Sequence, residues 1–389
     1  MGFRKTVSIG DLGKIVGGAT PSTKIQENWD GDIPWLCPKD LANYNQRYIS
    51  RGERNITQQG YESCSTKVLP TGTVLFSSRA PIGYIAIAKN PVCTNQGFKS
   101  IIPNDEIDSL FLYYLLKANK NRIESSGSGT TFKELSGKTF GAIEVSIPAS
   151  KDEQAAIAHI LGSLDNKIEL NNQINDYLAK LVSLEFEKQF GANTPAVDLS
   201  NVLDISTKTV KPQDYMEEIW EHYSIPAFDE ARWPAFEPAN KIKSNKYVID
   251  ENCILISKLN PSIKRLWIPL CITSRSVCST EFIVYKPKKP EYKSFYNAAI
   301  DSDSFSNYLL QHVTGSTGSR QRSQPKATLT YPIPNPDEKQ IAFFCAFADP
   351  IYNQIRNNEI ECQKLKTLRD LLLPKLVTGE INSSVIDIM

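Results

Sequence analysis

The stretch from Ile157 to Val182, IAHILGSLDNKIELNNQINDYLAKLV, places an apolar residue at nearly every third or fourth position. The members of this stripe are Ile157, Leu161, Leu164, Ile168, Leu178 and Val182. Residues three and four apart share a helix face, so the stripe predicts a long amphipathic helix. Just upstream, Ser150 to Glu153 (SKDE) fits a capping box that would start it.

A second stretch near the end of the chain repeats the pattern, with Phe344 standing 187 positions after Ile157. Its stripe consists of Phe344, Ala348, Ile351, Ile355, Cys362 and Leu365. At the same offset Asn358 matches Asn171, and a buried Asn can fix the register of paired helices. We therefore expect two helices that pack antiparallel as a coiled coil; the alternative, two helices each packed on its own domain, stays open. Pro350 should kink the second helix, and Pro374 and Gly379 should close it.

Four further motifs recur in the same order in both halves of the chain. They are Val74–Ser77 with Ile254–Ser257, Tyr114–Leu116 with Tyr308–Leu310, the Gly/Ser/Thr-rich runs 127–131 and 315–319, and Ile147-Pro148 with Ile333-Pro334. Recurrence in a fixed order indicates two copies of one unit. Within the copies, 73–88 predicts two strands around a turn and 281–285 a further strand. The chain is thus predicted to be two α+β globules, each followed by a long helix.

Composition excludes several classes of protein. The 389 residues carry 44 Lys and Arg against 43 Asp and Glu, so a uniformly basic nucleic-acid coat is excluded, although local basic patches are not. The 8 cysteines form no C-x-x-C pair and the 3 histidines are scattered, which argues against a zinc site and a disulfide scaffold and fits a cytoplasmic protein. No apolar run is long enough to span a membrane, so no membrane partner is expected.

The sequence contains only partial matches to catalytic motifs. Gly137-Lys138-Thr139 resembles the end of a phosphate-binding loop, but Phe132 stands where the first glycine of that loop is required. Pro336 to Lys339 resembles a nuclease carboxylate motif, yet a helix cap accounts for each of its residues. We therefore expect no catalytic residue and no metal site in this chain.

Basic residues gather in three stretches without any acid. These are 63–104, 252–280 and 304–336. Two of them occupy matching places in the two halves, which suggests two matched anion-binding surfaces, and DNA is the obvious polyanion. A solvated basic face without a ligand is the alternative. Trp29, Trp35, Tyr44 and Tyr48 could contact bases or form core.

A set of motifs in this order resembles the specificity subunit of type I restriction-modification systems. The motifs are Ile33-Pro34-Trp35, Lys39-Asp40-Leu41, Gly72-Thr73-Val74-Leu75, Ser78-Arg79, Ile82-Gly83, Asn95-Gln96-Gly97-Phe98, Gly127 to Leu135, Ile147-Pro148, Glu153-Gln154, Leu373-Pro374-Lys375-Leu376 and Thr378-Gly379-Glu380-Ile381. In the second half, Asn260-Pro261-Ser262 replaces the Arg-x-x-x-Gly turn, and Ser279 to Phe282 replaces the Asn-Gln-Gly-Phe motif.

The resemblance implies an α+β fold with two α/β target recognition domains, 1–148 and 191–334, in a pseudo-two-fold arrangement. Two long antiparallel coiled-coil helices, 149–190 and 335–389 with its tail, would separate them. It further implies a non-catalytic subunit that recognises a split site on double-stranded DNA. Two methyltransferase subunits, and restriction (translocase) subunits where present, would be its partners. S-adenosylmethionine, ATP and Mg would be bound by those partners, and no cofactor by this chain.

Candidate DNA contacts are polar or basic residues of the acid-free stretches and of the family motifs. They are Lys39, Ser78, Arg79, Asn95, Gln96, Lys99, Thr130, Thr131, Lys133, Lys258, Asn260, Lys264, Arg265, Arg320, Arg322 and Lys326. Arg79 stands out because a guanidinium offers a planar fork of donors to bases or phosphates. The alternative function is a coiled-coil adapter that joins two proteins without DNA specificity.

Overall fold

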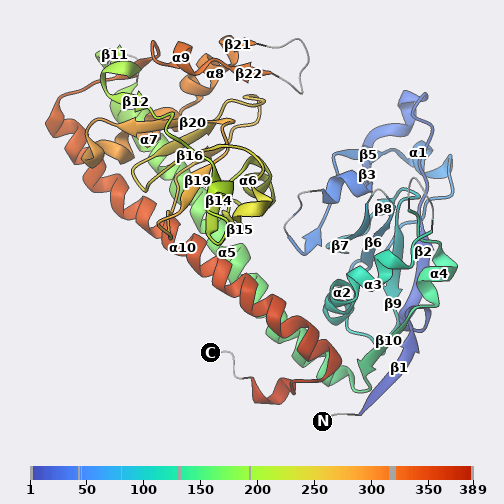
Figure 1. Cartoon of the computed structure of the whole chain (residues 1–389). Coiled ribbons are helices and arrows are strands. Elements are labelled where there is room, and N and C mark those ends of the chain that lie inside the picture. The colour runs from blue at the N-terminus through green and yellow to red at the C-terminus, as the bar shows by residue number, and fades with distance from the viewer. Residues whose placement is uncertain are drawn as a thin grey trace. The chain divides into compact units, whose positions relative to one another are not determined.

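The computed structural model describes residues 3–42, 44, 46–79, 81–128, 133–191, 194–314 and 321–386. The chain divides into two compact units (Figure 1). Unit 1 comprises Met1–Leu170 and Lys364–Met389, and unit 2 comprises Asn171–Gln363. The predicted boundaries at 148, 190 and 335 stay predictions, because each unit also includes part of both long helices.

Unit 1 is built on a five-stranded sheet in the order β2-β9-β6-β7-β4. Its strands are β2 (Gly13–Gly17), β9 (Lys99–Pro103), β6 (Val74–Ser78), β7 (Ile82–Ala88) and β4 (Tyr48–Ile49). Strands β6 and β7 form the antiparallel hairpin predicted over 73–88, which is confirmed. Strand β4 pairs in parallel with β7, and the other neighbours are antiparallel.

Smaller elements complete unit 1. Strands β5 (Arg54–Ile56), β3 (Trp29–Leu36) and β8 (Cys93–Thr94) form a second sheet, and β1 (Arg4–Ser8) pairs with β10 (Glu144–Pro148). The α-helices are α1 (Gln58–Glu62), α2 (Ser109–Ala118), α3 (Lys120–Ser125) and α4 (Gly137–Gly141). Four 3-10 turns are η1 (Ile9–Leu12), η2 (Gln26–Asn28), η3 (Pro38–Leu41) and η9 (Ser383–Val385). Helix α2 packs on β6 and β7 (Figure 1), and Asp108 caps it by accepting from Phe111 N at 2.7 Å.

Unit 2 repeats the main sheet as β12-β20-β17-β18. These strands are β12 (Leu203–Ile205), β20 (Phe282–Pro287), β17 (Ile254–Ser257) and β18 (Leu266–Trp267). Strand β20 confirms the strand predicted over 281–285. A second sheet has the order β13 (Thr209–Val210), β16 (Lys246–Val248), β19 (Ser276–Cys278), β14 (Ile219–Tyr223) and β15 (Ala235–Pro238).

The remaining elements of unit 2 are short. Two strand pairs are β11 (Ala196–Asp198) with β23 (Pro332–Pro334) and β21 (Val313–Thr314) with β22 (Arg322–Ser323). The helices are α6 (Ile225–Ala231), α7 (Lys293–Asp301), α8 (Asp303–Gln311) and α9 (Pro325–Thr328). The 3-10 turns are η4 (Leu199–Asn201), η5 (Pro212–Asp214), η6 (Ala239–Lys241) and η7 (Pro290–Tyr292).

The predicted duplication is confirmed by the strand order and by one shared pairing. In each unit the first strand pairs antiparallel with the strand that precedes a long helix, β1 with β10 and β11 with β23. One of the sequence matches does not join equivalent helices in the structure. Tyr114–Leu116 lie in α2, the first helix after β9, whereas Tyr308–Leu310 lie in α8, the second helix after β20. Helix α2 therefore corresponds to α7.

The long helices are α5 (Lys151–Phe190) and α10 (Glu338–Thr378). Asp337 caps α10, accepting from Gln340 N at 2.9 Å while the Gln340 side chain accepts from Asp337 N at 3.2 Å. The helix runs through Pro350 and also through Pro374, so the expectation that Pro374 closes it was wrong. Gly379, with a φ of 78°, follows its last turn and supplies the left-handed conformation typical of a helix end.

Side chains from the two helices meet in antiparallel order within each unit. In unit 2, Asn171 donates to Glu361 at 2.7 Å, and farther along α5 the Phe186 ring lies 5.6 Å from that of Phe344. In unit 1, Asp165 pairs with Arg369 at 2.6 Å. The predicted antiparallel packing and the α+β class are confirmed. The helices also pack on the sheets, since Ile157 and Leu161 belong to the core of unit 1.

The two buried asparagines do not face each other as the shared offset suggested. Asn171 bonds Glu361, and Asn358 donates to Asn175 Oδ1 at 2.7 Å. Antiparallel packing reverses the direction of one stripe, so residues at equal offsets in the repeat need not meet across the seam. Each asparagine finds another polar partner across the helix pair.

We expect Arg369→Met to lower the stability of unit 1 by about 3 kcal/mol, because Asp165 would stay buried without its cation. Asp165 also accepts from the Tyr114 hydroxyl at 2.6 Å, so the loss disturbs a buried network. Hydrogen exchange of the α2 amides measures the change. Asp370→Asn, at the exposed end of the same cluster, is the control and should cost under about 0.5 kcal/mol. Equal effects of the two variants would contradict the prediction.

Candidate nucleic-acid interface

A frame of backbone hydrogen bonds surrounds the turn after β6 in unit 1. Ser78 N donates to Gly97 O at 2.7 Å, and Ser78 O accepts from Leu135 N at 2.9 Å. Next to it, Arg79 and Glu134 form an antiparallel bridge. The frame therefore joins three segments that the sequence analysis singled out separately: the end of β6, the Asn-Gln-Gly-Phe motif and the end of the Gly/Ser/Thr-rich run.

The Asn-Gln-Gly-Phe motif forms a tight turn inside this frame. Asn95 Oδ1 accepts from Gly97 N at 2.8 Å, which is a hydrogen bond typical of asparagine in turns. A Cβ at position 97 would lie 2.8 Å from Pro38 Cγ, so the turn requires glycine for space. Gln96, at the tip, is exposed and its Oε1 accepts from the Thr20 hydroxyl at 2.6 Å.

The frame brings six of the candidate residues together, and these differ in what they present. They are Ser78, Arg79, Asn95, Gln96, Lys99 and Lys133. Ser78 is buried and its hydroxyl donates to Gly97 O at 3.1 Å, so it supports the frame. Lys133 is exposed, and Arg79 and Lys99 are half-buried. Within the part of the chain that the structure describes, the Arg79 guanidinium has no ion-pair partner.

Three candidates of the first half lie elsewhere or outside the described residues. Lys39 sits in η3 and pairs with Glu53 at 2.8 Å, with both side chains largely exposed. Such a pair is worth little in water, so Lys39 can exchange its partner for a phosphate. Thr130 and Thr131 lie outside the described residues.

Unit 2 contains the same frame with other residues. Lys258 N donates to Glu281 O at 2.9 Å, and Lys258 O accepts from Ser323 N at 2.9 Å. Leu259 and Arg322 form the neighbouring bridge. Lys258 therefore takes the place of Ser78, Leu259 that of Arg79, and Arg322 that of Glu134.

The turn inside this second frame is also retained. The Ser279 hydroxyl oxygen accepts from Glu281 N at 3.2 Å, as Asn95 Oδ1 does from Gly97 N. Glu281 brings a carboxylate to the position of Gly97, and it binds Arg322 through two bonds of 3.0 and 3.2 Å. This bonding raises the pKa of Arg322. The second frame thus presents a carboxylate beside a guanidinium, where the first presents Arg79 beside glycine.

The other candidates of the second half differ in their availability. Asn260 adopts a φ of 47° and donates its N–H to Gln321 O at 2.9 Å, so it belongs to the frame. Lys326 is exposed in α9. Arg320 lies outside the described residues. Lys264 pairs with Asp301 at 2.6 Å.

Arg265 is engaged inside unit 2. Its side chain is buried and forms a two-pronged contact with Asp229, at 2.6 and 2.8 Å. A buried pair of this kind is expensive to break. Of the sixteen candidates, Arg265 is therefore the basic residue that DNA could reach least easily.

The four aromatic candidates of the first half separate into core and surface. Trp29 and Trp35 are buried against each other, with ring centroids 5.1 Å apart in an edge-to-face contact. Arg54 lies over the Trp29 ring at 3.6 Å. Tyr44 is half-buried and donates to Tyr48 O, whereas Tyr48 is 38% exposed. Among the four, Tyr48 is the one with an accessible ring.

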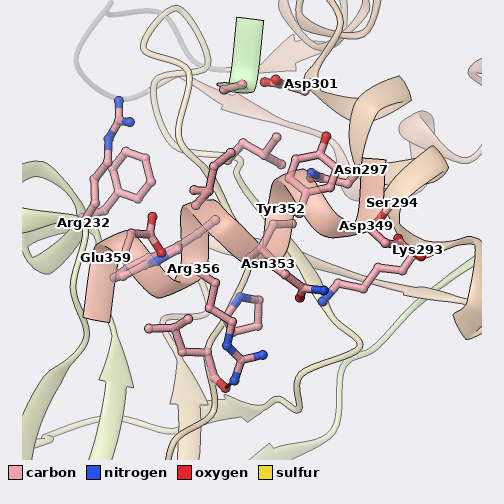
Figure 2. A pocket seen from close by; sticks show the side chains of 18 of the residues that line it. Arg232, Lys293, Ser294, Asn297, Asp301, Asp349, Tyr352, Asn353, Arg356 and Glu359 are labelled. Atoms are coloured by element: carbon pink, nitrogen blue, oxygen red, sulfur yellow. Dashed lines mark hydrogen bonds between the residues drawn. The ribbon is translucent and has the colours of Figure 1, made fainter. Parts of the chain in front are cut away.

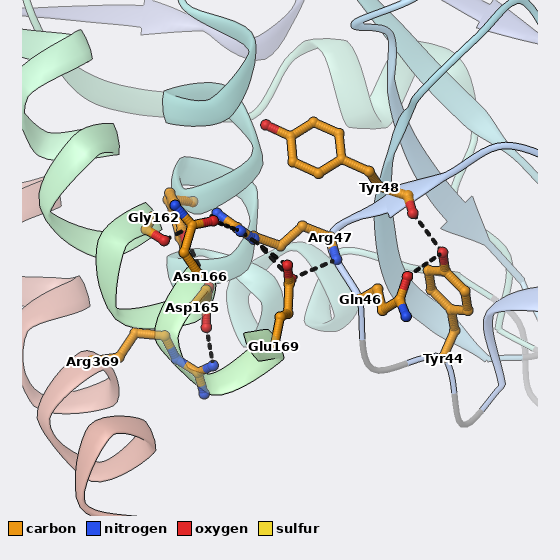
Figure 3. A network of polar contacts seen from close by, with 10 residues as sticks. Tyr44, Gln46, Arg47, Tyr48, Gly162, Asp165, Asn166, Glu169 and Arg369 are labelled. Carbon is orange, nitrogen blue, oxygen red and sulfur yellow. Dashed lines mark hydrogen bonds and ion pairs between the residues drawn. The ribbon is translucent and has the colours of Figure 1, made fainter. Parts of the chain in front are cut away.

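Sequence reasoning missed the anchor of this segment, which is Arg47 (Figure 3). Its buried guanidinium extends to α5, where Nε bonds Glu169 at 3.0 Å and Nη1 bonds Gly162 O at 3.3 Å. Nη2 bonds Asn166 and the second oxygen of Glu169. Arg47 and Glu169 are 122 positions apart, so no local charge pattern could have indicated the pair.

Metal-binding clusters and membrane-spanning helices are both absent from the described part of the chain. There, no three His, Cys, Asp or Glu side chains are grouped so that they could hold a metal ion. No described helix is both long and apolar enough to cross a membrane.

Comparisons with known proteins agree with the motifs. A family model described as the type I restriction modification DNA specificity domain matches residues 4–180. The specificity subunit of the type I restriction enzyme MjaIX from Methanocaldococcus jannaschii is 33% identical, with 96% of this chain and 92% of that protein covered. The EcoR124I/EcoR124II specificity subunit of Escherichia coli is 28% identical over 47% of this chain and 45% of its own. The crystal structure of the S subunit from M. genitalium matches with a TM-score of 0.59 at 17% identity over 96% of both chains, which shows a common fold.

We expect Arg47→Lys to loosen the segment around Tyr48, because an ammonium cannot replace the fork that binds Glu169, Asn166 and Gly162 together. Ile87 N donates to Arg47 O at 2.7 Å, so the exchange rate of the Ile87 amide reports on the segment. Loss of about 1.4 kcal/mol would speed this exchange about tenfold. Arg51→Lys, an exposed neighbour, is the control and should leave the rate unchanged. An unchanged rate in Arg47→Lys would contradict the anchor.

Proposed function

The chain belongs to the family of type I restriction-modification specificity subunits, and on that premise we propose that each unit recognises one part of a split DNA site. As a specificity subunit it is the non-catalytic member of such a system. Its partners are DNA and other subunits of the system. The observation that carries the proposal is the duplicated frame. Its hydrogen bonds recur in both units, while its side chains differ.

Different side chains on one frame are what two different half-sites require. Backbone and phosphate contacts position a protein on DNA, and side chains at the base edges supply specificity. Unit 1 offers Arg79, Gln96 and Lys133 at its frame. Unit 2 offers Lys258 together with the paired Arg322 and Glu281. The two units would then select different bases from a similar approach.

Protein partners have a candidate surface on α5. Its residues Ile174, Tyr177, Leu181 and Leu184 leave between 36% and 74% of each side chain exposed. Their spacing of three and four positions makes them one apolar stripe, and an exposed stripe of this kind marks an interaction surface. In our proposal methyltransferase subunits bind the long helices, two per chain, and restriction subunits join that assembly. S-adenosylmethionine, ATP and Mg belong to those partners, and the complex works in the cytoplasm.

The adapter alternative shares the helix surface and differs in the frames. An adapter without DNA specificity would tolerate substitutions at both frames. A recognition subunit would lose or change its DNA preference. Mapping of methylated sites in DNA treated with the chain and its methyltransferase partners distinguishes the two functions.

We expect Arg79→Ala to weaken selection of one part of the mapped site and Lys258→Ala to weaken the other part. A lost base contact costs about 1–3 kcal/mol, and a lost phosphate contact reduces the salt dependence of binding by about one ion. Lys188→Ala, an exposed residue of α5, is the control and should leave the mapped site intact. If both frame variants methylate the same bipartite site with unchanged efficiency, the frames do not recognise DNA.

We expect Leu181→Glu to abolish co-purification with the methyltransferase subunit, because it places a charge in the exposed apolar stripe. The change should leave the stability of the chain nearly unchanged, since this side chain is already about half exposed. Lys180→Glu alters the charge of the adjacent residue outside the stripe and serves as the matched control. Native mass spectrometry measures both complexes. Intact complexes in Leu181→Glu would remove this surface from the assembly.

A further inference from the structure

Unit 2 contains a cavity of about 650 Å³ beside α10 (Figure 2). Helix α7 contributes Lys293 and Asn297 to its wall, and α10 contributes Asn353, Arg356 and Glu359. Apolar wall is supplied by the Phe228 and Trp267 side chains, whose ring centroids are 5.3 Å apart. Cavities of this volume accommodate small organic ligands.

The repeat shows what fills the corresponding place in unit 1. Helices α5 and α10 begin at Lys151 and Glu338, so Asp349, Asn353 and Arg356 correspond to Gly162, Asn166 and Glu169. Those three residues of α5 are the partners of the buried Arg47 guanidinium. In unit 1 the place is therefore occupied by a side chain of the same unit.

No such side chain fills the cavity of unit 2. Arg232, which follows α6, lines the cavity, but it is exposed and lies over the Phe228 ring at 5.4 Å. In the described part of the chain it forms no ion pair with Glu359 or another carboxylate. The cavity is thus the open counterpart of an occupied site.

The charge on the helix is reversed between the two sites. Glu169, which neutralises Arg47, is replaced by Arg356, so the second site suits an anion. Arg356 Nη2 donates to Leu270 O at 2.9 Å, and Lys293 Nζ donates to Glu251 O. Neither cation has an ion-pair partner among the described residues. Burial, together with the charge of Arg356, lowers the pKa of Lys293.

Two of the four acids of the wall are unavailable to this pair of cations. Asp301 is engaged by Lys264 at 2.6 Å. Burial raises the pKa of Glu359 to about 7, so a large part of its carboxyl is neutral near that pH. Asp349 and Glu291 also line the cavity, and after burial it is the charge of Arg356 that most affects the pKa of Lys293. Two cations that line one cavity and have no ion-pair partner among the described residues are costly, and a bound anion would relieve that cost.

A second observation points to a ligand. The Asn297 side chain is buried and its amide bonds the Tyr352 hydroxyl, yet its Oδ1 has no hydrogen-bond partner among the described residues. A buried acceptor without a donor is rare in folded proteins. A ligand hydroxyl or N–H in this cavity would satisfy it.

We propose that this cavity binds a small organic phosphate, with the phosphate between Lys293 and Arg356 and the organic part toward Phe228 and Trp267. An arginine fork and a lysine are the side chains that proteins use most for phosphate. The volume exceeds that of a bare phosphate ion and leaves room for an organic group of nucleoside size. Binding would join α7 to α10 and raise the melting temperature of unit 2.

Isothermal titration calorimetry on the full chain tests this with three probes: inorganic phosphate, adenosine 5′-monophosphate and adenosine. We expect saturable binding of the monophosphate, weaker binding of phosphate, and none of adenosine. Arg356→Met and Lys293→Met should each lower the affinity for the monophosphate at least tenfold. Lys243→Gln removes one exposed charge of unit 2 outside the cavity and should leave that affinity unchanged. Melting curves of each variant show that it folds.

Two outcomes would overturn the proposal. One is that the unmodified chain does not bind the monophosphate, or that both folded cavity variants bind it with unchanged affinity. The other concerns the source of the phosphate, because a DNA backbone offers the same group. If Arg356→Met lowers the affinity for a short DNA duplex tenfold while the chain binds no free monophosphate, the cations serve DNA. Retained duplex affinity together with lost monophosphate affinity supports a separate ligand site.

Discussion

The pairing of α5 with α10 is the constraint on which both units depend. The core of unit 1 contains Leu373 and Leu376 from the end of the chain, and the core of unit 2 contains Val182 and Phe186 from its middle. Each such side chain contributes about 1.5–3 kcal/mol when it is buried. Neither unit can close its core from contiguous sequence. The fold therefore forms only when segments nearly the length of the chain apart have met, as Arg4 shows by donating to Val377 O.

The sequence predicted the two long helices, the β6–β7 hairpin and β20, but neither the remaining strands nor the axial alignment of the helix pair. The spacing of apolar residues identified both helices and the β6–β7 hairpin. Burial of one face of an element requires apolar residues at regular intervals, and this pattern is visible within the segment itself. The axial register of the helix pair depends on long-range contacts such as Asp165 with Arg369, which no local pattern contains. The same reason explains the error at Pro374: a proline weakens a helix locally, but packing of Leu373 and Leu376 into the core of unit 1 keeps that turn helical.

The candidate site was predictable in its location more than in its chemistry. Acid-free stretches predicted where cations gather. Ser78, Gly97, Lys258 and Ser323 of the frames lie in those stretches, whereas Glu134, Leu135 and Glu281 do not. Counting charges could not show which cations are engaged, because their acids come from other strands and helices. Arg265 binds an aspartate 36 positions away, and Arg322 a glutamate 41 positions away. Sequence comparison places Lys258 opposite Ser78, because the matched motifs Val74–Ser77 and Ile254–Ser257 precede them, but it could not show that both residues make the same backbone hydrogen bonds.

This independence of frame and side chain explains how two copies of one unit can diverge. The bonds that hold the frames involve N–H and C=O groups, so Lys258 can stand in the place of Ser78 while the same backbone bonds form. The same holds beside the long helices, where one copy buries Arg47 against Glu169 and the other places Arg356 at the wall of a cavity. Because the charge is reversed at corresponding helix positions, one copy binds its own side chain there and the other leaves a cavity. A net charge of +1 is then no obstacle to binding DNA. In our proposal the affinity depends on the few cations, such as Arg79 and Lys258, that have no ion-pair partner among the described residues.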